Sequence, residues 1–169
     1  FHVSIRFENV TARDALEALL ENYGLALVKR ADSSIYCLTK ALASARVWPD
    51  ETLDLETARL PPVVDEVVPL VVIDLVPALD AIRNTMRQTE INYQFDPEVL
   101  GMPLATNYSL RLTNVTLREL LIRELDDHGL ALKDSDHPSL FRVVRSRGPR
   151  RSAKYYSAAT VLASFANFD

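Results

Sequence analysis

Polar and apolar residues alternate near the start of the chain and then change to a helical spacing. Ser4-Ile5-Arg6-Phe7 alternates strictly, which predicts a half-buried β-strand. Further along, apolar residues recur at intervals of three and four, which is the spacing of a helix with one buried face. This apolar stripe consists of Ala12, Ala15, Leu16, Leu19 and Tyr23. The chain therefore opens with a predicted strand and a predicted amphipathic helix.

The residues at the ends of this helix carry start and stop signals. Thr11 stands where a hydroxyl caps the first turn, and Asp14 lies three residues on, at the partner position of a capping box. Gly24 follows the stripe, and glycine is favoured in the left-handed turn that ends a helix. Two short strands are predicted next, at Leu25–Lys29 and Ser34–Leu38. The first unit is thus β-α-β-β.

This unit occurs twice in the sequence. Val3–Leu27 aligns without a gap onto Tyr108–Leu132, 105 residues later, and 12 of the 25 aligned positions are identical. Thr116, Glu119 and Gly129 repeat the cap, its partner and the terminating glycine. The two stretches are therefore predicted to form the same local structure.

The second copy keeps an apolar stripe on its helix, although Glu124 replaces Leu19. Its two closing strands are predicted at Leu130–Lys133 and Leu140–Val144. The stripe itself is formed by Leu117, Leu120, Leu121 and Leu125.

Only the second copy is preceded by a further half unit. Val67–Ile73 predicts a strand, in which Pro69 favours an edge position. Pro77 suits the first turn of a helix, and Ile91–Phe95 alternates as another strand. The helix between them has a stripe of Ala78, Leu79, Ile82 and Met86. We predict an α+β fold built from small two-layer modules of β-α-β plus β-α-β-β type, repeated.

The repeat sets the expected domain organisation. Residues 67–145 are predicted to form a complete module, and residues 1–39 the second half of a first module. Residues 40–66 are expected to be a linker with one short helix, and residues 146–169 a basic tail with a candidate docking helix. Because a β-α-β-β piece alone buries little apolar surface, we expect it to dock on the second module or pair with another chain. Its first half is expected upstream of Phe1.

The combined pattern resembles a known family of domains. Residues 69–101 (PLVVIDLVPALDAIRNTMRQTEINYQFDPEVLG) and 109–132 (SLRLTNVTLRELLIRELDDHGLAL) are similar to the short N-terminal domain of secretins and TonB-dependent transducers. One departure is Thr89-Glu90-Ile91, which stands where the family often has a helix-ending glycine, so the helix is expected to end differently. The matching positions are Leu79, Ile82, Ile91, Asn92, Asp96, Pro97, Gly101, Asn114, Val115, Leu121, Leu125, Gly129 and Leu130.

The resemblance implies a non-enzymatic protein of the bacterial cell envelope, periplasmic or associated with the outer membrane. In secretins such domains form periplasmic rings below an outer-membrane channel. In TonB-dependent transducers they carry a signal to an inner-membrane regulator. The chain is therefore expected to serve protein–protein interaction within a secretin-like channel, a transducer or an adaptor. Its expected partners are other envelope proteins or further copies of itself, and no cofactor is expected.

Charge is distributed unevenly along the chain. Residues 145–169 carry five basic side chains and one acidic one, whereas residues 1–144 carry 14 basic and 22 acidic side chains, a net charge of −8. An acidic body argues against nucleic-acid binding by the body of the protein. The basic tail keeps open an alternative function, in which it contacts nucleic acid or an anionic surface such as a membrane.

Residues with reactive side chains are scattered. His2, His128 and His137 lack the paired spacing of a metal site, and His128 is expected to pack at a helix end. Cys37 lies in a predicted strand and is expected to be a packed or edge thiol. No catalytic or metal-binding residue is predicted. A small hydrolase with an irregular site remains a second alternative, and it requires polar residues that converge in a pocket.

The predicted binding elements are unpaired sheet edges, which recruit further strands. The candidate edges are Val67–Ile73, Ser34–Leu38 and Leu140–Val144. Partner binding is expected to involve these edges together with exposed charged positions on the two repeated helices. Those positions are Arg13, Glu17, Arg118 and Arg123.

Overall fold

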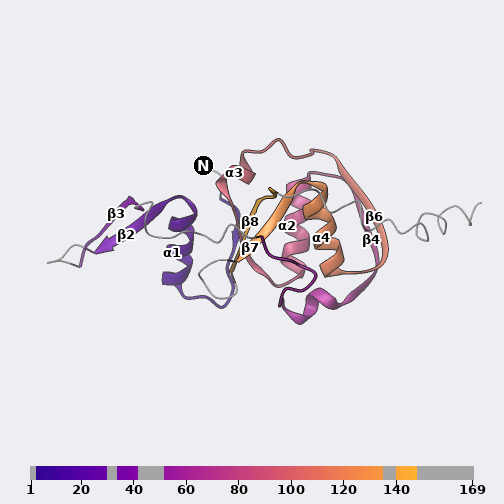
Figure 1. Ribbon diagram of the computed structural model, residues 1–169, viewed down its shortest axis with the longest axis horizontal. Coiled ribbons are helices and arrows are strands. Elements are labelled where there is room, and N and C mark those ends of the chain that lie inside the picture. Colours follow the sequence, from indigo (N-terminus) through magenta and orange to yellow (C-terminus); the bar gives the residue numbers. More distant parts are fainter. Residues whose placement is uncertain (1–2, 30–33, 42–51, 135–139, 148–169) are drawn as a thin grey trace, which may run out of the picture.

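The computed structural model describes residues 3–29, 34–41, 52–134 and 140–147, and it has the predicted mixture of helices and strands (Figure 1). The first part contains β1 (Ile5–Arg6), α1 (Ala12–Asn22), β2 (Leu25–Lys29) and β3 (Tyr36–Lys40). The second part contains the 3-10 helix η1 (Pro62–Asp65), β4 (Val67–Val76), α2 (Ala78–Gln88), β5 (Asn92–Phe95), α3 (Pro97–Leu100), β6 (Tyr108–Thr116), α4 (Leu117–Asp127), β7 (Leu130–Asp134) and β8 (Leu140–Arg145). The α+β class predicted from the sequence is confirmed.

Two helices occupy the middle of the second part. In Figure 1, α2 and α4 lie side by side, with β7 and β8 on one side and the two-stranded ribbon of β4 and β6 on the other. The apolar stripe predicted for each helix is buried, including Ile82 and Met86 on α2 and Leu121 and Leu125 on α4. These side chains meet residues from the sheet in one hydrophobic core. The ribbon thus adds a layer on the other face of the helix pair.

The larger sheet has the strand order β1-β5-β8-β7. β5 runs parallel to β8, while β1 pairs antiparallel with β5 and β7 pairs antiparallel with β8. Leu140–Val144, which the sequence suggested as a free edge, is therefore a central strand. The expectation was wrong because the parallel partner β5 lies 45 residues earlier in the chain, where local pattern gives no pairing information.

The helix caps follow the sequence signals closely. Thr116 accepts a hydrogen bond from the Glu119 backbone N–H, and the Glu119 carboxylate accepts from the Thr116 N–H, so this capping box is complete. In α1, Thr11 accepts from the Asp14 N–H, but the Asp14 carboxylate bonds to the Thr11 hydroxyl instead of its backbone. The aspartate side chain is one methylene shorter than that of glutamate. Its carboxylate therefore bonds to the nearer group, the threonine hydroxyl, and not to the backbone N–H.

A left-handed residue follows each long helix. Gly24 after α1 and Gly129 after α4 both have φ +65°, as predicted for terminating glycines. After α2 the same place is taken by Glu90, with φ +57°. The helix ends in the same kind of turn, so the expectation of a different ending was wrong. A non-glycine residue adopts the turn here at a conformational cost.

Part of the expected linker belongs to the core. Val64 is fully buried and Leu55 nearly so, and both join the cluster around α2 and α4. The backbone N–H of Leu53 donates to the carbonyl of Leu132 on β7. The short helix expected in this stretch is η1. Residues 52–65 are thus a covering segment, because their apolar side chains pack against α2 and α4. Residues 42–51 lie outside the described residues.

The first part is joined to the second through β1 and its neighbours. Ile5 and Arg6 pair with Gln94 and Tyr93 on β5. Asn92 fixes the next turn, since its side-chain oxygen accepts from the Glu8 N–H and its side-chain N–H₂ donates to the Glu8 carbonyl. A short antiparallel pairing and one bidentate amide therefore anchor the segment.

The stripe predicted for α1 is not its buried face. The buried residues of α1 are Ala18 and Asn22, and Asn22 donates to the carbonyl of Phe95. Leu16, in the middle of the stripe, is exposed. The helix was predicted correctly, but its apolar face is only partly covered, with Ala15, Leu19 and Tyr23 half-buried and Leu16 exposed.

Candidate interaction surface

The ribbon of β4 and β6 presents the longest open strand among the described residues. Its register runs from Val67 opposite Thr116 to Val76 opposite Tyr108, and β4 pairs with no other described strand. The sequence prediction that Val67–Ile73 forms an edge strand is confirmed. Backbone N–H and C=O groups along such an edge are available to a further strand.

One face of this ribbon is held by the second part. Ile73 and Leu110 pack against a small cluster of Ala78, Ala81 and Tyr108. Small side chains on α2 let the ribbon approach the helix closely. Because side chains alternate across a strand, this contact turns the neighbouring residues outward.

Several apolar residues of β4 are exposed, with Leu70 and Val72 on the outward face and Val67 and Leu75 near the ends of the strand. These four, called here the β4 strip, are each at least half exposed. The β4 strip consists of Val67, Leu70, Val72 and Leu75. Single exposed apolar residues are ordinary, but four along one open strand form a candidate interaction surface.

A bulge shapes one end of the β4 strip. The register shifts between Ile73 and Val76, and Leu75 adopts φ +51°. The Leu75 N–H donates to the Ser109 hydroxyl, which in turn donates to the Asp74 carboxylate. A leucine with positive φ is strained, and the local hydrogen bonds hold it with its side chain in solvent.

Of the charged residues predicted to bind a partner, Arg13 and Glu17 are on the surface. The Arg13 Nε lies 2.8 Å from a Glu17 carboxylate oxygen one turn along α1. The Arg13 side chain is 84% exposed. Their role in partner binding stays a prediction.

Arg118 was expected to be exposed, and it is not. Its side chain is only 16% exposed and forks onto the Asp65 carboxylate, while Nη1 donates to the carbonyls of Leu55 and Ala58. The Arg118 hydrogen bond holds the pKa of Asp65 below its ordinary value. Arg118 is therefore engaged in fastening residues 52–65, which sequence spacing did not reveal.

Arg123 is also more enclosed than expected. Its Nε lies 2.9 Å from Asp127 on the same helix, and the Tyr108 hydroxyl donates to that carboxylate. His128 caps the end of α4, with Nδ1 2.8 Å from the Glu124 carbonyl and its ring edge-on to Tyr108. The predicted helix-end position of His128 is confirmed. This cluster joins α4 to β6.

Glu124 is a fully buried acid beneath this cluster. Neither of its carboxyl oxygens makes a well-formed hydrogen bond among the described residues, and the Thr85 hydroxyl is the polar group that α2 brings near them. Burial raises the pKa of Glu124 to about 7; the Thr85 hydroxyl opposes this rise and the negative charge of Asp127 adds to it. The sequence signal was the single acid in an otherwise leucine stripe. It marks a buried acid whose pKa lies near neutrality.

The candidate reactive side chains are dispersed over the described residues. No group of three or more His, Cys, Asp or Glu among them is placed to hold a metal ion. A hollow of about 250 Å³ between residues 52–56 and α4 is lined by apolar and small polar side chains together with Glu56 and Asp126. Cys37 is exposed on β3, at a strand edge as expected. His2 and His137 lie outside the described residues.

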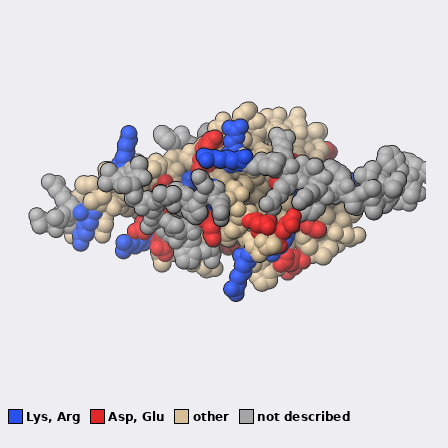
Figure 2. All heavy atoms as spheres, in the orientation of Figure 1, with Lys and Arg blue, Asp and Glu red and all other residues tan. Residues whose placement is uncertain are grey.

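Charge is mixed over the surface. On the face shown in Figure 2, basic and acidic side chains are interspersed over the described part of the chain. Ser146 and Arg147 are the described residues of the predicted basic tail, residues 146–169, and Arg145 ends β8; the remainder of the tail lies outside the described residues. In the described part, none of the helices has the length and apolar character required to span a bilayer.

Comparisons of the chain with models of protein families, with curated proteins and with solved structures return no match.

Proposed function

We propose that the chain is a non-enzymatic protein–protein interaction module of the bacterial cell envelope. It acts as part of a secretin-like channel, a TonB-dependent transducer or an adaptor, in the periplasm or at the outer membrane. The observation that carries the interaction role is the β4 strip, four exposed apolar side chains along a strand with an open edge. The envelope setting rests on the resemblance of the sequence to the short N-terminal domain.

Strand addition is the mode of binding that this surface favours. An incoming strand gains main-chain hydrogen bonds from the free side of β4. Its alternate side chains cover Leu70 and Val72, which lie two residues apart on the same face. Burying apolar surface on one face and pairing one edge supplies both affinity and register.

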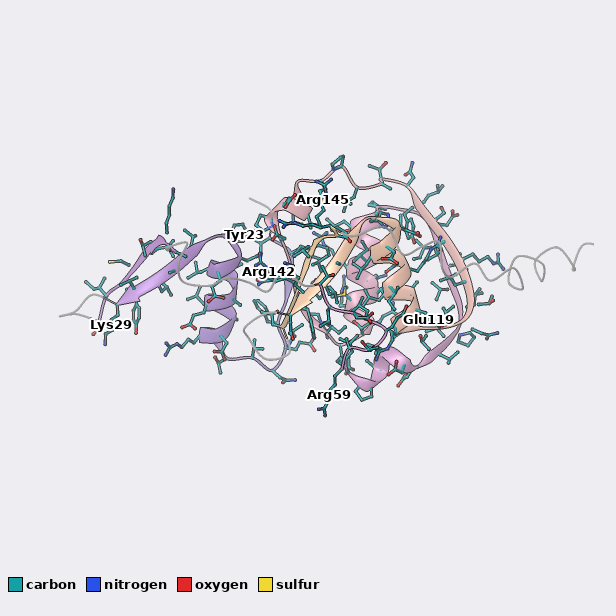
Figure 3. The ribbon with its side chains drawn as sticks, viewed as in Figure 1. Tyr23, Lys29, Arg59, Glu119, Arg142 and Arg145 are labelled. Carbon is teal, nitrogen blue, oxygen red and sulfur yellow. The ribbon has the colours of Figure 1, made fainter. Side chains whose placement is uncertain are left out.

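Photo-crosslinking in the native bacterium tests the proposal. A photoreactive amino acid replaces Val72 in the natural protein, and a matched control carries it at Arg59, an exposed residue outside the β4 strip (Figure 3). We expect a discrete crosslink from Val72 to one envelope protein or to a second copy, and none from Arg59.

A second change makes the experiment specific. Leu70→Lys in the Val72-labelled protein places an unpaired charge in the interface and is expected to lower the crosslink yield on the order of tenfold. Equal crosslinks from Val72 and Arg59, or a yield insensitive to Leu70→Lys, contradict binding through β4. Recovery of the protein solely with the cytoplasmic fraction contradicts the envelope setting. It does not affect the conclusion about binding through β4, which depends on the crosslinks alone.

A further inference from the structure

The two repeated segments have the same local structure but different surroundings. Asn9 and Asn114 are left-handed, with φ +56° and +52°, and both helices have 11 residues with a threonine cap. In the second segment β8 lies between β7 and β5. In the first segment β3 pairs with β2 alone among the described strands.

The difference is visible at matched apolar positions. Leu16 is 44% exposed, whereas Leu121 at the same place in the second segment is fully buried. Leu38 is 59% exposed, and its counterpart Val143 is fully buried. Tyr36, the counterpart of the buried Phe141, is exposed to a similar degree. The first segment thus displays the apolar face that becomes core in the second.

The second segment shows what covers that face. α2 packs against α4, and β5 pairs in parallel with β8 in the register of Tyr93 with Phe141 and Phe95 with Val143. The cover is a helix followed by a strand, residues 78–95. The preceding strand β4 belongs to the ribbon with β6. In the first segment the counterpart of β6 is β1, and β1 is already paired with β5.

We propose that α1 and the β2–β3 hairpin form a docking surface for a helix–strand unit donated by a partner protein. The donated strand pairs in parallel with the free edge of β3, and the donated helix packs on the Leu16 face of α1. Only a helix and a strand are required, because β1 has its partner within the chain. The hairpin projects from the rest of the molecule, with Lys29 at its far end, so a partner reaches it without displacing other elements (Figure 3). This surface is separate from the β4 strip, and its inference does not depend on the proposed function.

A peptide copy of the chain's own cover provides the probe. The peptide spans residues 77–96 (PALDAIRNTMRQTEINYQFD), which include α2 and β5. A fluorophore on Cys37, the single cysteine of the sequence, reports binding next to β3. Because side chains alternate along β3, Cys37 faces away from Tyr36 and Leu38, so the label leaves the apolar face open. We expect saturable binding of this peptide and none of a scrambled peptide of the same composition.

Two matched lysine substitutions locate the site. Leu38→Lys charges the apolar face and is expected to weaken binding about tenfold or more. Val28→Lys is the control, since Val28 is exposed on the same hairpin but pairs with Cys37 and so lies on the opposite face. Lysine also stands at the equivalent place, Lys133, in the second segment. Both side chains are exposed, so circular dichroism is expected to show both variants folded.

Amide hydrogen exchange distinguishes the remaining outcomes. Bound peptide is expected to slow exchange at the β3 amides. The proposal is overturned if the peptide does not bind, if Leu38→Lys and Val28→Lys act equally, or if the slowed amides lie in β8 instead, which indicates exchange with the chain's own β5. Sedimentation that shows self-association through the hairpin, blocked by Leu38→Lys without peptide, also overturns it in favour of a second copy as the occupant.

Discussion

The guanidinium of Arg118 and the carboxylate of Asp65 form a forked pair, with Nε 2.6 Å from Oδ1 and Nη2 3.1 Å from Oδ2. The same side chain reaches two backbone carbonyls in residues 55–58. Arg118 on α4 therefore binds residues 55–65, a segment that precedes it by more than 50 residues in the chain. A planar fork with five donors suits this task, whereas a lysine offers a single point charge.

Arg118→Ala is expected to lower the free energy of unfolding by about 2 kcal/mol, because two partly buried carbonyls lose a charged donor. Arg118→Lys is expected to recover only part of this loss. Urea unfolding measures both, and Arg13→Ala, at an exposed position on α1, serves as the control and is expected to change nothing measurable. A loss for Arg13→Ala equal to that for Arg118→Ala contradicts the fastening role.

Glu124→Leu is expected to stabilise the protein above pH 7, since the first segment already has leucine at the equivalent position. The pKa of Glu124 is raised from 4.5 to about 7 in the folded protein. Below pH 4.5 the acid is neutral in both states and costs little. As the pH rises from 4.5 to 7 the unfolded state ionises first, so stability falls, by up to about 3 kcal/mol at pH 8.

Thermal unfolding between pH 4.5 and 8 measures this loss. The ionisable groups near Glu124 are Asp127, Arg123, His128 and Tyr108 on α4 and β6, while α2 contributes the uncharged Thr85. The stability of Glu124→Leu is expected to fall much less over this pH range than that of the unmodified protein. Glu17→Gln, which replaces an exposed acid, is expected to show the same fall as the unmodified protein. A decline that persists in Glu124→Leu assigns the effect to another group.

Glu90→Gly is expected to raise the free energy of unfolding by about 1 kcal/mol, because a glycine pays no steric cost at φ +57°. Glu90→Ala keeps a Cβ and is the control, with no gain expected. Chemical denaturation compares the two. If alanine stabilises as much as glycine, removal of the glutamate side chain rather than backbone strain is responsible.

Asn92→Ala is expected to loosen the attachment of the first part, at a cost of about 1.5 kcal/mol for two lost hydrogen bonds to Glu8. Amide exchange is expected to quicken in β1 and leave β7 and β8 unchanged. Asn92→Asp keeps the acceptor for the Glu8 N–H but loses the donor to the Glu8 carbonyl, so an intermediate effect is expected. Equal exchange in β1 for all three proteins speaks against this anchor.

Local structure was readable from the sequence. The capping residues Thr11 and Thr116, the terminating glycines and the stripes of α2 and α4 predicted helices that begin and end where the structure has them. These features depend on side chains within a few residues of one another, and their hydrogen bonds form whatever the rest of the chain does. The open edge of β4 followed from a similarly local signal, Pro69 within the predicted strand.

Pairing over long distances was decided by the tertiary structure. Leu16 and Leu121 share their local sequence, yet one is exposed and the other buried, because α2 packs on α4 and β5 pairs with β8, while no described helix or strand takes these places beside α1 and β3. The central position of β8, the core role of Val64 and the engagement of Arg118 arise in the same way. The sequence around a residue determines its backbone conformation and the direction in which its side chain points. Burial also requires a second surface that packs against that side chain, and the packing of the whole chain determines which surface this is.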